Sequence, residues 1–124
     1  VKFHDAVAYE DVPDFYRDPA VVVNPALNES FGRSLIEAMA FAVPVVATRV
    51  GGMPEIVEHG CEGLLVAPED PRALAEAIVR VLTDPAGAAA MGRAGRKTVE
   101  KRYTWDAIAA RAINVYEETL RGVR

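Results

Sequence analysis

The chain has 124 residues, of which 51% are hydrophobic, and a formal net charge of −4 at pH 7, so it forms at most one domain, large enough for a buried core. The acidic balance argues against nucleic acid as a partner, because no basic patch with interleaved aromatic residues accompanies it. One cysteine excludes an internal disulfide and a thiolate metal site, two histidines far apart in the sequence argue against a metal centre, and no apolar run approaches the ~20 residues of a membrane span.

The first part of the chain predicts a strand, a short helix and a second strand. Residues 1–3 are typical of a short strand. The helix extends over residues 11–18, with a proline in its first turn, and it turns Phe15 and Tyr16 toward the core. Residues 20–24 form an apolar, β-branched run without alternation, which is typical of a parallel strand covered on both faces.

Residues 28–40 connect that strand to another apolar run at residues 43–47, and they predict a βαβ crossover. Four apolar residues of the connection fall at helical spacing: Leu35, Ile36, Met39 and Ala40. The turn at residues 29–32 therefore lies at the carboxyl end of a strand, where open α/β sheets bind their ligands. Gly32 lets a ligand approach the backbone, and the free N–H groups of the first helical turn attract anions.

Two carboxylates eight residues apart, Glu29 and Glu37, flank this turn. Glu37 lies roughly 7 Å along the helix axis at ~1.5 Å per residue, and helical side chains lean toward the N-terminus. With a diphosphate on the helix N-terminus, Glu37 can accept hydrogen bonds from two ribose hydroxyls, and Glu29 faces whatever the far phosphate carries. Ser34 and Glu37 also fit a capping box, so the spacing alone leaves a purely structural role open.

The second half of the chain predicts another loop on the ligand side and one more strand. Gly51 and Gly52 precede a helical turn that starts with a proline, which indicates a loop beside the first one, with a mobile surface turn as the alternative. Residues 63–66 are typical of a buried strand, and a glycine marks the turn before them.

Three helices follow. Asp70-Pro71 and Asp84-Pro85 are each typical of a helix start, and Thr104 caps the last helix. The first helix has one apolar stripe: Leu74, Ile78, Val81 and Leu82. The second contains glycines that each cost up to ~1 kcal/mol relative to alanine, so we expect it to be the least rigid: Gly87, Gly92 and Gly95. The last has an apolar face that we interpret as core: Trp105, Ile108, Ala112, Val115 and Tyr116.

Several motifs occur in a fixed order around the two carboxylates, which form an E-x7-E pattern. They are Glu29-Ser30-Phe31-Gly32, Ile36-Glu37-Ala38-Met39-Ala40, Pro44-Val45-Val46-Ala47-Thr48, Gly51-Gly52-Met53-Pro54-Glu55-Ile56-Val57 and Gly63-Leu64-Leu65-Val66. Together they resemble the retaining nucleotide-sugar glycosyltransferases of family 4, also called group 1, which have the two-domain GT-B fold. The resemblance covers Val1 to about Tyr116.

The resemblance implies an α/β fold, a Rossmann-like parallel sheet flanked by helices that is the C-terminal half of a GT-B fold without its first strands. Residues 1–124 are then a partial donor-binding domain, the acceptor domain is absent from this chain, and the final helix packs toward that missing N-terminal domain. The strands at Val21, Val45 and Leu64 correspond to the fourth, fifth and sixth of a doubly wound sheet.

The function implied is retaining, metal-independent glycosyl transfer from a nucleoside-diphosphate sugar to an unknown sugar, lipid or small-molecule acceptor. No cofactor is expected, and the location is cytoplasmic, with contact to a membrane periphery through the missing domain as an alternative. Glu29 is the catalytic residue that orients the donor sugar, and Glu37 binds the ribose. The remaining donor-binding residues implied are Ser30, Phe31, Gly32, Arg33, Ser34, Gly51 and Gly52.

Ala42 departs from the usual family sequence, and the role of Arg33 has two interpretations. Ala42 stands where the family usually has glycine, and a positive φ there costs on the order of 1 kcal/mol, so we expect a different helix exit. Arg33 either reaches a phosphate, which we favour, or only covers the surface.

Other functions stay open on the sequence alone. They are a non-catalytic nucleotide-sugar binding module, another GT-B-related enzyme such as a sugar-nucleotide epimerase, and a structural fragment without ligand affinity. Because the strand at Val22 would form an unpaired sheet edge, we expect the isolated chain to self-associate, to let the segment at Val1 move in beside Val22, or to occur only as part of a longer polypeptide. We expect the isolated chain to be inactive and to bind nucleotides weakly at most.

Overall fold

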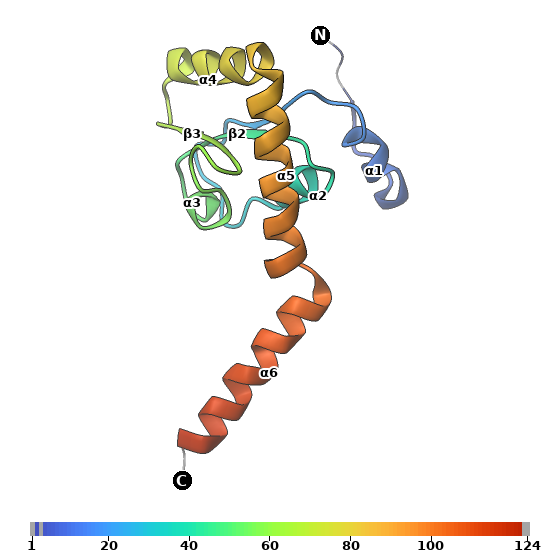
Figure 1. Ribbon diagram of the computed structural model, residues 1–124, viewed down its shortest axis with the longest axis vertical. Coiled ribbons are helices and arrows are strands. Elements are labelled where there is room, and N and C mark those ends of the chain that lie inside the picture. The colour runs from blue at the N-terminus through green and yellow to red at the C-terminus, as the bar shows by residue number, and fades with distance from the viewer. Residues whose placement is uncertain (1, 3, 123–124) are drawn as a thin grey trace.

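The computed structural model describes residue 2 and residues 4–122 (Figure 1), so the strand predicted at residues 1–3 lies outside the described residues. The fold is α/β, as predicted. Its elements in chain order are η1 (Tyr9–Asp11), α1 (Val12–Phe15), β1 (Val22–Asn24), α2 (Arg33–Ala40), β2 (Val45–Thr48), α3 (Met53–Ile56), β3 (Gly63–Val66), α4 (Pro71–Thr83), α5 (Pro85–Arg102) and α6 (Trp105–Gly122).

The three strands form one parallel sheet in the order β1-β2-β3. Val22 lies opposite Val45 in the first pair, and Val46 lies opposite Leu64 in the second. The order and direction confirm the sequence prediction for these strands. Among the described residues β1 pairs only with β2, so β1 is an edge strand of the described sheet.

Helices cover both faces of the sheet, and successive residues of β2 alternate between two hydrophobic clusters. Val45 and Ala47 pack in a cluster with buried residues of α2, α3 and α5, whereas Val46 packs with Leu64 and buried residues of α4. The four residues of β2 are all buried. This double coverage explains why the strand sequences are continuous apolar runs.

The three helix starts that the sequence predicts from capping side chains are confirmed. The side chain of Asp70 accepts a hydrogen bond from the N–H of Ala73, and that of Asp84 accepts one from the N–H of Gly87. Thr104 accepts one from the N–H of Ala107 at the start of α6. Each bond satisfies an N–H group that the helix itself leaves unpaired.

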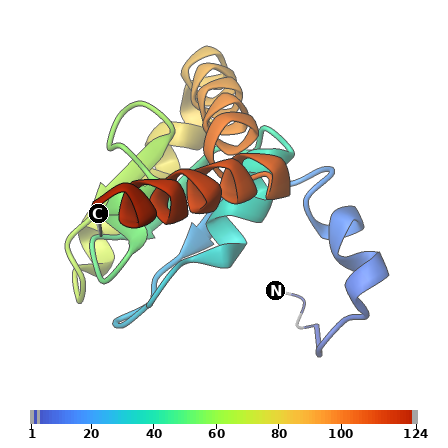
Figure 2. The same ribbon diagram turned by 90° about the horizontal axis from the view of Figure 1, so that it is seen from below.

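The residues that the sequence predicts to face the core are wrong at several positions, because the packing of the elements against one another decides which side chains are covered. Phe15 is exposed, because α1 is a single turn that lies beside α2 and apart from the sheet in both views (Figure 1, Figure 2), and only Tyr16 reaches the core. In α2, Ala38 is buried in place of Ala40. In α4, Leu82 is exposed and Ala77 is buried.

Two of the glycines of α5, Gly92 and Gly95, lie against α2 and its C-terminal end and let the two helices approach closely. A Cβ atom at Gly92 would overlap the carbonyl oxygen of Ala42, and one at Gly95 would press on the side chain of Met39. Ala42 itself has φ = +58°, so our expectation of a different helix exit is wrong. Ala42 adopts the left-handed conformation because it lets the N–H groups of Ala42 and Val43 donate to carbonyl oxygens at the end of α2.

The final helix α6 has no buried residue, and the interpretation of its apolar face as core is wrong within this chain. Trp105 is 86% exposed and Tyr116 is 68% exposed. Figure 1 shows α6 leaving the end of α5 and extending away from the sheet. None of the helices in the described part of the chain has the length and apolar character required to cross a membrane.

We expect Gly92→Ala to lower the free energy of unfolding, although alanine is the better helix former by up to ~1 kcal/mol. The added methyl group would overlap the backbone at Ala42, which cannot move without displacing α2. Urea denaturation measures the effect. Gly122→Ala is the matched control, because a Cβ atom there meets nothing within 4 Å. Equal stability of Gly92→Ala and the wild type would show that α5 does not depend on this approach.

Candidate functional site

The loop between β1 and α2 ends in a left-handed glycine. Gly32 has φ = +79° and precedes the first residue of α2, and no side chain caps this helix. Ser34 lies inside the helix and accepts a hydrogen bond from the Asn24 side chain at 3.3 Å. The capping box of Ser34 with Glu37, which the spacing allowed as a structural alternative, is therefore absent, and no side chain caps the first N–H groups of α2, which can attract an anion.

Glu29 is folded back onto its own turn. Its Oε1 accepts a hydrogen bond from the N–H of Phe31 at 3.3 Å. Hydrogen bonding to the backbone N–H of Phe31, and then of Gly32, lowers the pKa of Glu29 below its usual value. Glu29 is therefore a carboxylate at neutral pH, held at the exposed side of the turn.

The two glycines of the second loop pack directly against this turn, as the sequence predicts. The N–H of Gly52 donates to the carbonyl oxygen of Glu29 at 3.2 Å. A Cβ atom at Gly51 would overlap that same oxygen, and one at Gly52 would overlap the carbonyl oxygen of Ser30. Only glycine fits at both positions, so this contact determines where Glu29 and Phe31 lie.

Glu37 has a partner on each of its carboxylate oxygens. Oε1 accepts from the Nε of Arg33 at 2.7 Å, and Oε2 accepts from the hydroxyl of Tyr16 at 3.1 Å. The Tyr16 ring stacks on Phe41, with ring centroids 6.1 Å apart. Burial, together with the hydrogen bond to Glu37, raises the pKa of Tyr16 to about 12. The guanidinium of Arg33 also lies over the ring of Tyr9, 5.6 Å from its centroid.

Sequence reasoning missed the aromatic residues of this site. Tyr16 was predicted only as a core residue, and Tyr9 was not singled out. The bond between Tyr16 and Glu37 joins residues 21 positions apart on different elements, and no sequence spacing reveals it.

Six of the nine predicted site residues line two open hollows that meet at Phe31, whereas Glu29, Gly32 and Ser34 line neither of them. One, of ≈ 590 Å³, is lined by Arg33 and Glu37 together with Trp105. The other, of ≈ 440 Å³, is lined by Ser30, Gly51 and Gly52 and by arginines of α5 and α6. Tyr103 contributes to both and contacts the ring of Phe31 edge-on. The residues of both predicted loops therefore surround one surface at the carboxyl ends of β1 and β2.

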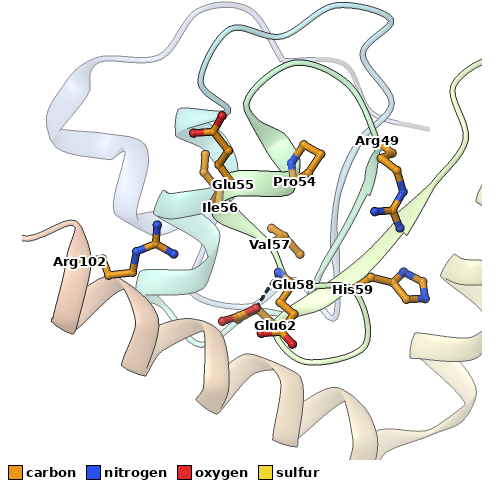
Figure 3. Close-up of a pocket in the computed structure, with 9 residues that line it drawn as sticks. All are labelled: Arg49, Pro54, Glu55, Ile56, Val57, Glu58, His59, Glu62 and Arg102. Atoms are coloured by element: carbon orange, nitrogen blue, oxygen red, sulfur yellow. Dashed lines mark hydrogen bonds between the residues drawn. The ribbon is translucent and has the colours of Figure 1, made fainter.

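A further hollow of ≈ 400 Å³ lies between α3, the segment before β3 and the end of α5 (Figure 3). Arg49 and Arg102 stand on opposite sides of it in the close-up. Glu62 is nearly buried there and is fully engaged, since it accepts from the N–H of Glu58 at 2.8 Å and from the hydroxyl of Thr98 at 2.7 Å.

Glu58, Cys61 and Glu62 lie close enough together to be considered as ligands of a metal ion. Desolvation and the carboxylates of Glu62 and Glu58 raise the pKa of the Cys61 thiol, which opposes the thiolate that a metal needs. Because Glu62 is already hydrogen-bonded through both oxygens, we interpret this cluster as structural.

A comparison with known protein families matches most of the chain to one family. Residues 1–84 match the family described as "Glycosyl transferases group 1". D-inositol 3-phosphate glycosyltransferase from Streptomyces bingchenggensis is 37% identical over 124 residues, which are 100% of this chain and 27% of the relative. The chain thus spans about a quarter of the length of the curated relatives it matches.

Solved structures show the same fold. Sucrose-phosphate synthase from Thermosynechococcus elongatus superposes with a TM-score of 0.87 and 39% identity, covering 98% of this chain and 30% of that protein. The C-terminal domain of a glycosyl transferase group 1 family protein from Francisella tularensis gives 0.76 and 27%, covering 83% and 53%. HepE from Anabaena in complex with UDP gives 0.81 and 28%, covering 87% and 30%, and HepE is also solved with UDP-glucose.

We expect the stability of the protein to fall more steeply between pH 10 and pH 12 in the wild type than in Tyr16→Phe. The pKa of Tyr16 rises from 10.0 to about 12 on folding. The unfolded chain therefore loses this proton first, and the stabilisation is complete below pH 10 and is lost as pH rises toward 12. Urea denaturation at several pH values measures both slopes. Identical slopes would contradict the burial of the Tyr16 hydroxyl beside Glu37.

Proposed function

The chain belongs to the family of group 1 glycosyl transferases, and from that premise we propose that it supplies the donor-binding part of a retaining transfer from a nucleoside-diphosphate sugar. The observation that carries the proposal is the arrangement of Glu29 and Glu37 on either side of the uncapped N-terminus of α2. Activity measured on the full-length protein with nucleotide-sugar donors tests it.

Each part of the site suits one part of such a donor. The free N–H groups that follow Gly32 favour the diphosphate, and Arg33 adds a positive charge beside them. Glu37, oriented by Tyr16, is the ribose acceptor. Glu29, with its lowered pKa, presents a carboxylate to the sugar beyond the far phosphate. The complexes of HepE with UDP and UDP-glucose support this class of donor.

We propose that the acceptor binds to sequence beyond this chain. We propose that the exposed apolar face of α6, which includes Trp105 and Tyr116, packs against the missing N-terminal domain, and that this domain binds the acceptor. We further propose that the reaction is metal-independent, because the helix N-terminus and Arg33 can balance the diphosphate charge. A non-catalytic nucleotide-sugar module would share the donor contacts but would show no transfer with any acceptor.

We expect Glu37→Ala in the full-length protein to weaken donor binding by about 1.5–3 kcal/mol, the range for hydrogen bonds to a charged group. A 2′-deoxyribose donor should then lose little further affinity, because its missing hydroxyl no longer has an acceptor. Isothermal titration calorimetry measures both effects. Glu76→Ala is the matched control, since Glu76 also pairs with an arginine one helical turn away but is exposed on α4. Normal donor binding by Glu37→Ala with a lowered melting temperature would assign Glu37 a structural role.

We expect Glu29→Gln to depress transfer while leaving the dissociation constant of the product nucleotide within about twofold of the wild-type value. Glutamine retains an acceptor for the N–H of Phe31 but lacks the charge that the sugar would meet. Steady-state kinetics and nucleotide titration separate the two effects. An equal loss of nucleotide affinity and of turnover would place Glu29 on the diphosphate.

A further inference from the structure

The carboxylate of Glu37 is held by two partners of different kinds. Tyr16 is a neutral, partly buried donor whose ring is stacked on Phe41, so its position is set by packing. Arg33 is a charged donor whose side chain is 66% exposed, and it lines the hollow of ≈ 590 Å³ described above. Of the two partners, only Arg33 can leave Glu37 without disturbing the core.

The pair of Arg33 and Glu37 differs from the other side-chain ion pairs of the described residues. In those pairs both partners are between 59% and 88% exposed. Glu37 is only 27% exposed, and both residues line the same hollow. Arg33 donates to Oε1 of Glu37 at 2.7 Å, so a ribose hydroxyl that approaches Oε1 from the hollow competes with Arg33 for this oxygen.

The free energy that opposes the departure of Arg33 from Glu37 is small. Exposed ion pairs one helical turn apart contribute little to stability, the contact of the guanidinium with the ring of Tyr9 is a second weak restraint, and the guanidinium is already in contact with the solvent. An arginine bound to a phosphate forms stronger, frequently bidentate hydrogen bonds. Arg33 is the first residue of α2, so a phosphate at the N-terminus of this helix lies within the reach of its side chain.

We propose that Arg33 is a specificity-determining residue that makes Glu37 available to the ribose only when the ligand also carries a diphosphate. This inference rests on the proposed function of the site. A nucleoside without phosphates must displace Arg33 and offers it no new anion. A nucleoside diphosphate supplies that anion, so Arg33 transfers from Glu37 to the phosphates as Glu37 binds the ribose. The exchange selects against free nucleosides.

The test compares uridine with UDP as ligands of the full-length protein and its Arg33→Met variant, by calorimetry for UDP and by NMR titration for uridine. Arg33→Met frees Glu37, so uridine should bind about twofold more tightly, the factor for a lost exposed ion pair one helical turn apart. UDP should bind about tenfold more weakly, because the phosphates lose a charged donor. The two affinities therefore change in opposite directions.

Two other variants separate this exchange from general effects. Arg72→Met removes an exposed arginine that pairs with Glu76 on α4, and both affinities should stay unchanged. Tyr16→Phe removes the permanent partner of Glu37 and keeps the stacked ring, so uridine and UDP should weaken by the same factor.

Salt gives a measurement that needs no variant. Raising the salt concentration screens the exposed pair of Arg33 and Glu37, so uridine should bind more tightly to the wild type, whereas UDP should bind more weakly. This experiment decides the question even if Arg33→Met does not fold.

The outcomes are distinct. Weaker or unchanged uridine binding by a folded Arg33→Met variant, or uridine affinity that does not rise with salt in the wild type, overturns the exchange and leaves the proposed function standing. If the wild type binds none of UDP, GDP and ADP, the proposed function itself is overturned.

Discussion

The site depends on the close approach of two backbone segments, the turn at Glu29 and the glycine pair at Gly51 and Gly52. The hydrogen bond from Gly52 to the carbonyl oxygen of Glu29 joins the loops that follow β1 and β2. No side chain fits between them. Because Gly32 lies three residues further along, this contact also determines where α2 begins and therefore where its free N–H groups point. An added methyl group at either glycine would displace the whole turn.

The other end of α2 is determined by a second close approach, between α2 and α5. Gly92 lies against the carbonyl of Ala42, and Gly95 lies against Met39. Ala42 adopts φ = +58° at the end of α2, where a glycine would be unstrained. Both ends of α2 are thus held by contacts that require small residues, and such rigid support is what a helix needs to hold Glu37 at one distance from the turn.

The two acidic residues are held in different ways. Glu29 is stabilised as a carboxylate by N–H groups of its own turn, which lower its pKa. Glu37 is engaged by Tyr16 from the core and by Arg33 from the solvent. A residue held by local backbone keeps its position whether or not a ligand is bound, whereas a residue paired with an exposed arginine can exchange partners. The first arrangement suits a group that orients a sugar, and the second suits a group that must release one partner to bind another.

The sequence alone determined the features that act over a few residues. The apolar runs predicted the three strands, Asp70 and Asp84 predicted two helix starts, and the change from an apolar run to helical spacing predicted the turn that carries Glu29, whereas the order of the strands came from the family resemblance. These features depend on backbone hydrogen bonds and on side chains a few residues away.

The tertiary structure alone decided which residues are covered and what the charged residues contact. The tight packing of Gly92 on Ala42 and the bond of Tyr16 to Glu37 join segments far apart in the chain. Trp105 is exposed because the described residues leave most of its side chain uncovered. Burial and long-range pairing follow from how the elements pack together, and no local pattern specifies that packing.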